Sequence, residues 1–284
     1  MNVGLIHVDG KYPNLALMKI SAWHKARGDE VEFYYPLNDA KYENIYVSKV
    51  FSLTPDNEYI PDHAEKGGWG YNTCELPPEI EHIYPDYSLY GCDYAMGFTS
   101  RGCIRNCPWC IIPEKEGRLR ATADIYEFWR GQNEIMLMDN NLMALPDHFE
   151  TVMKQTHNEG LVVREHGMDI RLVNADKARL LWMNKPHGQW HFAWDRPQDE
   201  EAVRRGIATL INNGVAAYKL MFYVLIGFNT TPEEDLYRVE TLKGLGVDPF
   251  VMPYDKSDRY QRNFARWVNH KAIFKTVKWE EYVA

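Results

Sequence analysis

Short apolar runs alternate with polar turns over the first fifty residues. Residues 3–8 form an apolar run that predicts a buried strand, and a polar turn follows it. Apolar positions then recur at mostly helical spacing over residues 13–28, which favours a helix that stops at the glycine at position 28. Further strands are expected at residues 31–35 and 46–51. This strand–helix–strand order predicts a small Rossmann-like sheet.

Residues 54–90 lose this periodicity. They contain five prolines and a Gly-Gly-Trp-Gly turn at residues 67–70, which is typical of irregular chain. We therefore interpret residues 1–90 as a Rossmann-like domain with a linker that wraps onto a second domain, residues 91–284.

An almost regular strand-plus-helix unit repeats in the second domain. Candidate strands begin at intervals of 40, 27, 29, 29 and 29 residues, near Tyr94, Glu134, Leu161, Trp190, Lys219 and Asp248. Helices are expected between them, at residues 122–130, 147–159, 175–184, 199–213 and 232–245. Six such units make a parallel sheet covered by helices, and right-handed crossovers curl it toward a barrel. Since eight units close a barrel, we predict an open (β/α)6 partial TIM barrel, followed by a helical segment at residues 260–274.

Composition narrows the possible environment and partners. No apolar run approaches a membrane span, and the first residues lack the layout of a signal peptide, so we expect a cytoplasmic protein. The formal net charge of -8 argues against membrane or nucleic-acid partners. The last thirty residues are nonetheless locally basic, which we interpret first as a solvated helix face.

The cysteines suggest a metal centre rather than disulfides. Three of the five lie at Cys103, Cys107 and Cys110. The spacing C-x3-C-x2-C can bind three irons of a 4Fe–4S cube and leave the fourth iron open. Two alternatives are a zinc site completed by Cys74 or Cys92, and a closed electron-carrying cluster. Both are less favoured, because the motif directly follows the first barrel strand, where such folds place their active sites.

The segment Cys-Ile-Arg-Asn-Cys-Pro-Trp-Cys at residues 103–110 resembles the motif of the radical S-adenosylmethionine superfamily. The resemblance covers roughly residues 91–284. It implies that S-adenosylmethionine chelates the open iron and is cleaved reductively to a deoxyadenosyl radical, which abstracts hydrogen from a substrate. It also implies a reductant such as flavodoxin or ferredoxin. The two remaining cysteines are too few for the auxiliary clusters of peptide-modifying members.

The same resemblance suggests cofactor-binding residues. Trp109 is expected near the cluster and the adenine, a role compatible with core packing. Asp139 follows the second strand, where members commonly carry Gly-Gly-Glu; a helix cap is its alternative role. Asp169 and Arg171 resemble the superfamily's Gly-x-Asp-x-Arg segment, with a surface ion pair as the alternative.

Later strands add further candidates. Asp195 and Arg196 end the fourth strand, where ribose or carboxylate contacts arise in the superfamily. Ile226 lies in residues 223–228, whose backbone resembles the stretch that packs on adenine, although the side chains suit a buried strand. Polar and aromatic positions that could face the barrel interior are Arg164, His166, His191, Trp194 and Lys219.

The N-terminal region resembles a shortened cobalamin-binding domain. The motif Asp-x-His-x-x-Gly, which supplies the lower cobalt ligand, is absent, and His7, His24 and His63 lack its context. Because some branches bind cobalamin without a histidine, its absence is not disproof, but we favour a vestigial or repurposed domain. The absence of Gly-x-Gly-x-x-Gly argues against a dinucleotide.

Three functions remain open at this point. The first is a radical enzyme that abstracts hydrogen from a small molecule or peptide of unknown identity. The second is a cobalamin-dependent methyl or group transferase of the same superfamily. The third is an iron–sulfur redox module without turnover.

Overall fold

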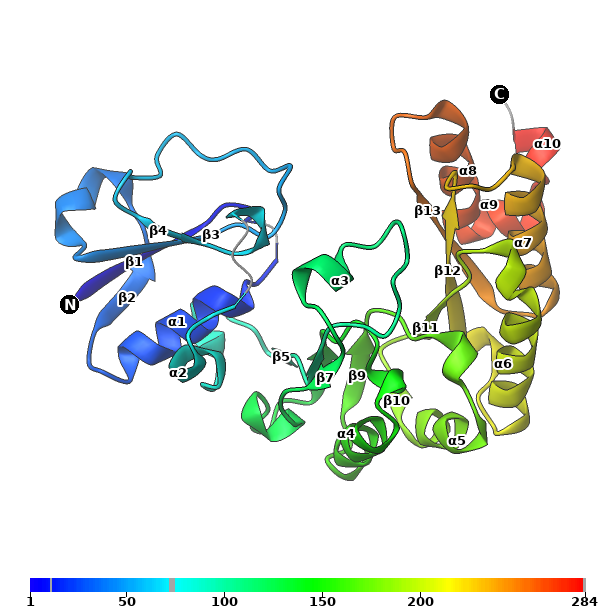
Figure 1. The fold of residues 1–284 in the computed structure, drawn as a ribbon, viewed down its shortest axis with the longest axis horizontal. Coiled ribbons are helices and arrows are strands. Elements are labelled where there is room, and N and C mark those ends of the chain that lie inside the picture. The colour runs from blue at the N-terminus through cyan, green and yellow to red at the C-terminus, as the bar shows by residue number, and fades with distance from the viewer. Residues whose placement is uncertain (11, 72–74, 283–284) are drawn as a thin grey trace.

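The computed structural model describes residues 1–10, 12–71 and 75–282. It is a mixed α/β protein with parallel sheets, arranged as an N-terminal part and a larger second part (Figure 1). No helix within the described residues is long and apolar enough to span a membrane.

The N-terminal part is a four-stranded parallel sheet in the order β2-β1-β3-β4. Val3 and Leu5 of the central strand pack against Leu17 and Ile20 of the helix in the apolar core of this part. The elements are β1 (Asn2–His7), α1 (Leu15–Lys25), β2 (Glu30–Phe33), β3 (Asn44–Ser48) and β4 (Glu65–Gly67). The expected strand–helix–strand opening is therefore present.

Two features of this part differ from expectation. Residues 54–90 were expected to be mostly irregular, yet they contribute β4 and the short helix α2 (Pro78–Glu81). Strand β4 escapes detection because it has only three residues, two of them exposed, and so carries no apolar run. Gly68 ends it with a positive φ of 93°, at a point where a Cβ atom would lie 2.4 Å from the Lys49 carbonyl oxygen.

All six strands expected in the second part are present, but they do not form one sheet. They are β5 (Ala95–Gly97), β8 (Glu134–Leu137), β9 (Val162–Glu165), β11 (Trp190–Ala193), β12 (Leu220–Ile226) and β13 (Asp248–Pro253). One sheet has the order β10-β9-β8-β5, where β10 is Lys185–Pro186, and the other has the order β11-β12-β13.

The break between the two sheets lies after β9. A single bridge, Met168 to Phe192, connects them. The Glu165 carboxylate bridges this break, because it accepts a hydrogen bond from the backbone N–H of His191 in β11 at 2.6 Å. Its other oxygen accepts a local hydrogen bond from the Gly167 N–H, also at 2.6 Å. The continuous sheet that the repeat suggested is thus interrupted by a side chain.

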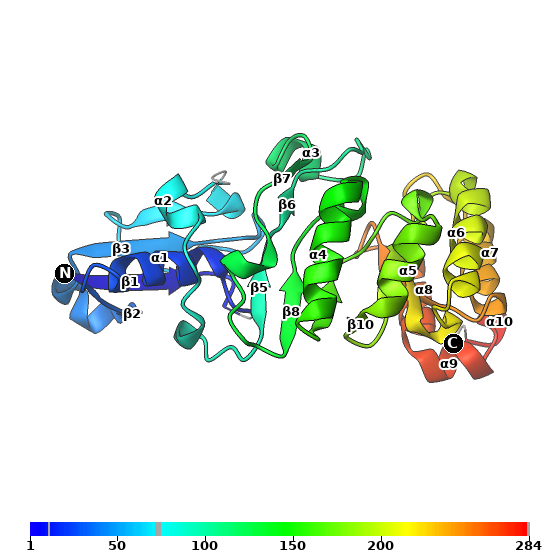
Figure 2. The ribbon, with the colours of Figure 1, turned by 90° about the horizontal axis from the view of Figure 1, so that it is seen from below.

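Helices line one side of these strands, as Figures 1 and 2 show. They are α4 (Pro146–Asn158), α5 (Ala175–Met183), α6 (Glu200–Asn212) and α7 (Pro232–Gly244), followed by α8 (Arg259–Asn269), α9 (Lys271–Thr276) and α10 (Trp279–Tyr282). The helix expected at residues 122–130 is wrong: the chain there makes one 3-10 turn, Ile125–Glu127. Asp124 caps that turn, and Gly131, with a φ of 98°, changes the chain direction soon after it.

Candidate functional site

The cysteine loop, residues 102–119, is closed at its base by a short antiparallel pair. Strand β6 (Ser100–Arg101) pairs with β7 (Arg120–Ala121), and the Cys103 N–H donates to the Gly117 carbonyl at 3.4 Å. Gly102 has a φ of 81°, and a Cβ atom there would lie 2.5 Å from the Arg118 carbonyl oxygen. The glycine before the first cysteine is therefore required by close backbone approach.

Glu116 ties this loop to the end of β8. Its carboxylate accepts hydrogen bonds from the Gly102 N–H at 2.9 Å and from the Asn140 side-chain amide at 2.6 Å. Arg101 approaches the other oxygen at 3.4 Å. The side chain of Glu116 is 6% exposed, so the three contacts hold a buried charge in place.

The three cysteines lie in this one loop. Cys103 and Cys107 are half-buried and Cys110 is exposed. Burial raises the pKa of Cys107; Cys110 and Cys103 raise it further, whereas Arg171 lowers it. Cys92 interacts instead with Asp93 and Tyr94. Cys74 lies outside the described residues.

Three cysteine thiols suit an iron–sulfur cluster, although they are too far apart in this structure to bind one metal centre together. Within the described residues, no three or more His, Cys, Asp or Glu side chains form a ready metal site, so the thiols would have to converge on a bound cluster. The Cys103 sulfur already accepts hydrogen bonds from the Arg105 N–H at 3.3 Å and from the Asn141 amide at 3.4 Å. Such donors stabilise cluster thiolates. The Asn141 Oδ1 atom is buried without a partner, which leaves an acceptor beside the loop.

An ion-pair network connects the loop to the chain after β9. Asp169 accepts hydrogen bonds from Arg105 at 2.8 Å and from Arg171 at 2.7 Å. Burial would raise the pKa of Asp169, but the hydrogen bonds from both arginines outweigh it and lower the pKa. Arg171 also reaches Asp199 at 3.3 Å. The structure thus places the predicted residues Asp169 and Arg171 against the cysteine loop.

A row of aromatic rings connects the loop to β12 and β13. The Trp109 ring meets the Phe228 ring edge-on, with centroids 5.3 Å apart, and Phe228 meets Tyr254 at 4.9 Å. Ile226, which is fully buried, accepts a backbone hydrogen bond from Tyr254 at 3.1 Å. Its side chain packs in the core, and only its backbone is placed near the loop through Phe228.

Asp195 and Arg196 differ in their surroundings. Asp195 accepts a hydrogen bond from the Leu225 N–H at 3.3 Å, and burial raises its pKa. It also raises the pKa of Cys107, so the predicted residue lies within electrostatic range of the loop. Arg196 is exposed and pairs with Asp199.

The Asp139 carboxylate is bound by neighbouring residues of this chain. Its side chain is buried and accepts hydrogen bonds from the backbone and hydroxyl groups of Thr99 and Ser100, the residues that precede the loop. Burial raises its pKa, while these hydrogen bonds lower it. The carboxylate therefore holds the entrance of the cysteine loop, and its predicted contact with a cofactor stays a prediction.

The residues expected to face the barrel interior differ in how exposed they are and in what they contact. His191 lies on the less buried face of β11, where its ring stacks on Tyr223 at 5.6 Å and contacts Glu165 at 3.0 Å. His166 is exposed, and Arg164 pairs with Glu134. Trp194, in contrast, is buried, and its ring N–H donates a hydrogen bond to the backbone carbonyl of Arg196. Lys219 contacts the Gly188 carbonyl in the loop before β11.

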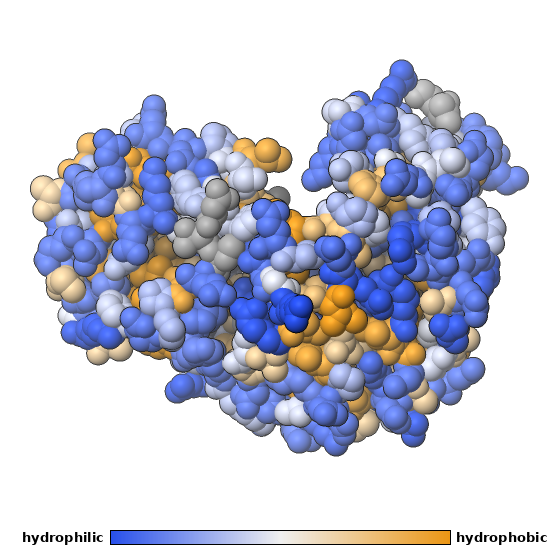
Figure 3. All heavy atoms as spheres, in the orientation of Figure 1, coloured by the Kyte–Doolittle hydropathy of each residue, from blue (hydrophilic) through white to orange (hydrophobic). Residues whose placement is uncertain are grey.

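Two neighbouring hollows flank the loop. One, of about 290 Å³, is lined by residues that include His166 and Asn140. The other, of about 180 Å³, reaches to the start of α1 and to Ser48 at the end of β3. Phe98, Lys115 and Met138 line both hollows. The surface is indented between the N-terminal part and the part built by β12, β13 and α8 (Figure 3).

Sequence reasoning missed several residues that build this site. Glu116, Asn140 and Asn141 hold the loop or its sulfur, and Arg105 carries the ion pair to Asp169. The Asn-Asn pair directly after the second strand was the available signal, because strand ends of parallel sheets gather polar groups. The sequence position of Glu116 did not indicate that its carboxylate would bind Gly102 and Asn140.

No protein-family model and no curated protein matches this sequence. Among solved structures, the radical S-adenosylmethionine methyltransferase TsrM from Kitasatospora setae, determined with cobalamin and a [4Fe-4S] cluster bound, is similar. The TM-score is 0.63 and the identity 14%, over 89% of this chain and 74% of that chain. At this identity the two proteins share a fold, and the chemistry has to be argued from the site.

Proposed function

We propose that this protein is a radical S-adenosylmethionine enzyme. When bound by Cys103, Cys107 and Cys110, a 4Fe–4S cluster would supply the electron that cleaves S-adenosylmethionine to a deoxyadenosyl radical for hydrogen abstraction from substrate. The observation that carries the proposal is the attachment of the cysteine loop to the chain after β8, β9 and β12. The sequence motif thereby stands at the ends of several parallel strands, where α/β enzymes place their chemistry.

Residues of the chain have separate roles in this proposal. The Asn141 amide and the Arg105 N–H hold the Cys103 sulfur, and Asn141 Oδ1 is free to accept a hydrogen bond from the cofactor's amino group. Asp169 and Arg171 fix the loop from the side of β9 and offer charged groups for the cofactor. Trp109 packs on Phe228 and shields this side from water.

The fold that we propose around the loop is an open (β/α)6 partial barrel. Its strands follow one another in chain order, β5-β8-β9 and β11-β12-β13, with parallel pairing inside each set. The similarity to TsrM over 89% of this chain supports this arrangement. Residues 1–90 would form a Rossmann-like domain that precedes it. Its setting would be the cytoplasm, where thiols stay reduced.

A cobalamin-dependent methyl or group transferase is the second candidate. The TsrM structure contains cobalamin, and the similarity to it covers 89% of this chain. The hollow beside Ser48 lies at the carboxyl ends of β3 and β4, where such sheets bind ligands. The histidines do not point to a cobalt ligand: His7 contacts Tyr90, and His24 is buried against Asp29. A domain without cobalamin therefore remains the favoured interpretation.

Anaerobic reconstitution with iron and sulfide tests the first function. After reduction by dithionite and addition of S-adenosylmethionine, deoxyadenosine should accumulate, and the cluster spectrum should shift on cofactor binding. An intact cluster that yields no deoxyadenosine would leave a redox module without turnover. Cobalamin retained through desalting would instead favour the transferase.

Single cysteine changes test the ligand set. Cys103→Ala, Cys107→Ala and Cys110→Ala should each abolish cluster binding, because a cube needs all three thiolates to hold three irons. Cys92→Ala is the matched control and should keep the iron content of the wild type, as should Cys74→Ala. The measurement is iron per chain together with the charge-transfer absorbance. Cluster loss in either control would mean a fourth protein ligand and a closed cluster.

A further inference from the structure

Lys115 is a charged side chain without a counter-ion in the part of the chain that the structure describes. It ends the short helix α3 (Ile112–Lys115), which faces the N-terminal part (Figure 1). No carboxylate of the described residues lies within 4 Å of its ammonium group, and its contact there is the Trp69 ring, whose centre is 6.0 Å away. Three neighbouring hollows, of about 180, 200 and 290 Å³, share Lys115 in their lining.

The other charged groups around the hollow of about 180 Å³ are bound to one another. Glu81 accepts hydrogen bonds from Lys19 at 3.1 Å and from Arg101 at 3.2 Å, and Arg101 also reaches Glu116 at 3.4 Å. The described lining of this hollow therefore has three cations, Lys19, Arg101 and Lys115, and the one carboxylate of Glu81. In a chain with a net charge of -8, this local excess of positive charge is not a consequence of composition. An anion in the hollow would balance it.

Hydrogen-bond donors at the end of the hollow favour the same kind of ligand. The start of α1 lines it through Asn14, Leu15 and Ala16. The first N–H groups of a helix have no partner within the helix, and no acid stands in the first turn of α1. Ser48, which is 4% exposed, accepts a hydrogen bond from the Asn14 amide at 2.8 Å, and its own hydroxyl proton has no acceptor among the described residues. A buried donor without a partner favours a ligand that accepts hydrogen bonds.

The remaining walls of this hollow are apolar. Trp69 lines it on the side of the N-terminal part, and Phe98 and Met138 line both this hollow and the one of about 290 Å³. The larger hollow includes Asn140, whose amide binds the cysteine loop. A ligand anchored at Lys115 would run along Phe98 and Met138 toward that loop. The volume suits a small molecule and is too small for a corrin macrocycle.

We infer that the hollow between α1 and Lys115 binds the carboxylate of a small organic acid whose apolar body lies along Phe98 and Met138. The Lys115 ammonium supplies the charge, and the Ser48 hydroxyl and the start of α1 supply hydrogen bonds. The inference rests on the proposed function in one respect, because it makes this acid the substrate whose far end reaches the cysteine loop. A phosphate monoester fits less well, since it carries more negative charge than one free cation balances.

Binding of para-fluorobenzoate to the reconstituted holoenzyme, followed by fluorine NMR line broadening, tests the site without turnover. The wild type should bind this probe. Lys115→Met, which keeps the length of the side chain, should weaken binding about tenfold, because the ammonium group is lost. Lys115→Arg should stay within about threefold of the wild type, because the charge persists. The neutral probe para-fluorobenzyl alcohol should bind weakly, and equally to the wild type and Lys115→Met.

Lys154→Met is the matched control, because Lys154 is exposed and already paired with Glu150, and it should leave probe binding unchanged. No binding to the wild type, no weakening in Lys115→Met, or equal weakening in the control would overturn the site. Equal binding of the neutral probe would overturn the preference for an acid, and tighter binding of para-fluorophenyl phosphate through Lys115 would replace the carboxylate with a phosphate. Displacement of the probe by hydroxocobalamin would assign the hollow to the corrin of the transferase instead. Absent deoxyadenosine after reduction with dithionite would reject the proposed function alone, because probe binding needs no turnover.

Discussion

Asp139 shows how one buried carboxylate can hold the start of the cysteine loop in place. Its two oxygens serve the backbone and hydroxyl donors of Thr99 and Ser100, immediately before the cysteine loop. Buried donors that lose such a partner pay the cost of desolvation without compensation. The position after strand β8 therefore matters for the stability of the loop, whatever cofactor binds above it.

Removing this carboxylate should destabilise the protein. We expect Asp139→Ala to lower the free energy of unfolding by about 3 kcal/mol, because the N–H groups of Thr99 and Ser100 lose a buried acceptor. Urea denaturation measures it. The control Asp176→Ala removes a carboxylate with an 83% exposed side chain and should cost under about 0.5 kcal/mol. Equal stability of both variants, with cofactor binding lost in Asp139→Ala, would assign Asp139 to the cofactor alone.

His191 joins the two sheets through a charge-dependent contact. Burial lowers the pKa of His191, but the hydrogen bond from its ring to Glu165 outweighs burial and raises the pKa above 6.5. Protonation is therefore easier in the folded protein than in the unfolded chain. The stabilisation is complete below about pH 6.5 and is lost as the pH rises through the folded-state pKa.

The direction of this pH dependence can be measured by replacing His191 with glutamine, which does not titrate. The difference in unfolding free energy between the wild type and His191→Gln should be larger at pH 5.5 than at pH 8.5. His7→Gln is the control of opposite sign, because burial lowers the pKa of His7 and its contribution is lost as the pH falls. Parallel stability curves for the wild type and His191→Gln would show that the Glu165 contact does not depend on charge.

At the scale of elements, the cysteine loop depends on a backbone shape. Gly102 and Gly117 both have positive φ, 81° and 71°, at opposite ends of the loop. A Cβ atom at Gly102 would meet the backbone of Arg118, whereas nothing lies within 4 Å of one at Gly117. Alanine at each of the two positions therefore separates the cost of a steric clash, present only at Gly102, from the cost of a positive φ, present at both.

Gly102→Ala should cost more than Gly117→Ala. We expect a loss of about 3 kcal/mol for Gly102→Ala, from strain plus the clash with Arg118, and about 1 kcal/mol for Gly117→Ala. Iron retained after reconstitution should fall in Gly102→Ala and stay near the wild type in Gly117→Ala. Similar stability and iron content in both variants would contradict the closed loop base.

The strands of the second part could be predicted because each has its own apolar run. The break after β9 could not be predicted, because a repeat in the sequence does not show that a side chain, here the Glu165 carboxylate that accepts from the His191 N–H, bridges two strands in place of a ladder. The helix expected near Ile125 failed for a related reason: apolar spacing resembles a helix there, but the local cap at Asp124 closes a single turn.

The site was predictable where the motif is local. The cysteines and the Asp169–Arg171 pair are close in sequence and lie together in the structure. Contacts between distant segments, such as Glu116 with Asn140 and Arg105 with Asp169, depend on how loops fold over strand ends. Those contacts cannot be predicted from the positions of the residues in the sequence.

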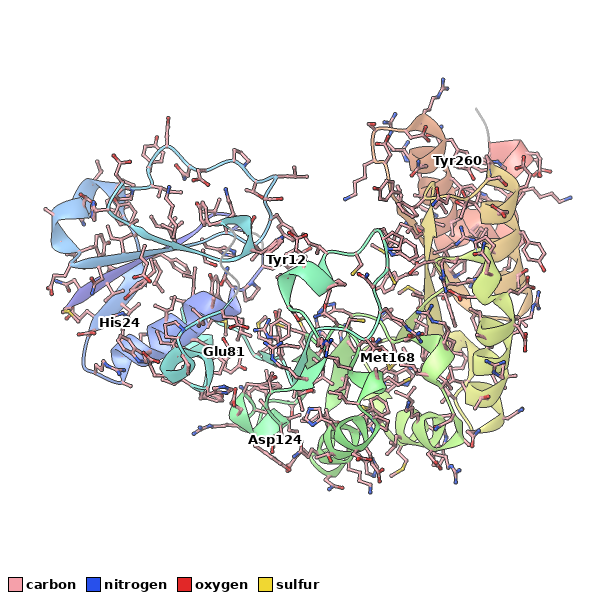
Figure 4. The ribbon with its side chains drawn as sticks, viewed as in Figure 1. Tyr12, His24, Glu81, Asp124, Met168 and Tyr260 are labelled. Atoms are coloured by element: carbon pink, nitrogen blue, oxygen red, sulfur yellow. The ribbon has the colours of Figure 1, made fainter. Side chains whose placement is uncertain are left out.

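For the whole molecule, Glu81 is one of the acids that tie the N-terminal part to the cysteine loop. Glu81 binds Lys19 of α1 at 3.1 Å and Arg101 of β6 at 3.2 Å. Figure 4 shows Glu81 beside α1, on the side that faces the second part. The hollow of about 180 Å³ is lined by residues from both parts, including these three. Its shape therefore depends on this contact.

Glu81→Ala should loosen the N-terminal part without unfolding it. Lys19, whose side chain is 7% exposed, keeps its bond to the Glu81 backbone carbonyl but loses the carboxylate, so we expect about 2 kcal/mol of destabilisation. Hydrogen exchange should rise in α1 and in β6, because both lose the same partner. Glu79→Ala, exposed on the same short helix, should change neither. Faster exchange in α1 alone would mean that Arg101 is held by Glu116, and that Glu81 does not connect the two parts.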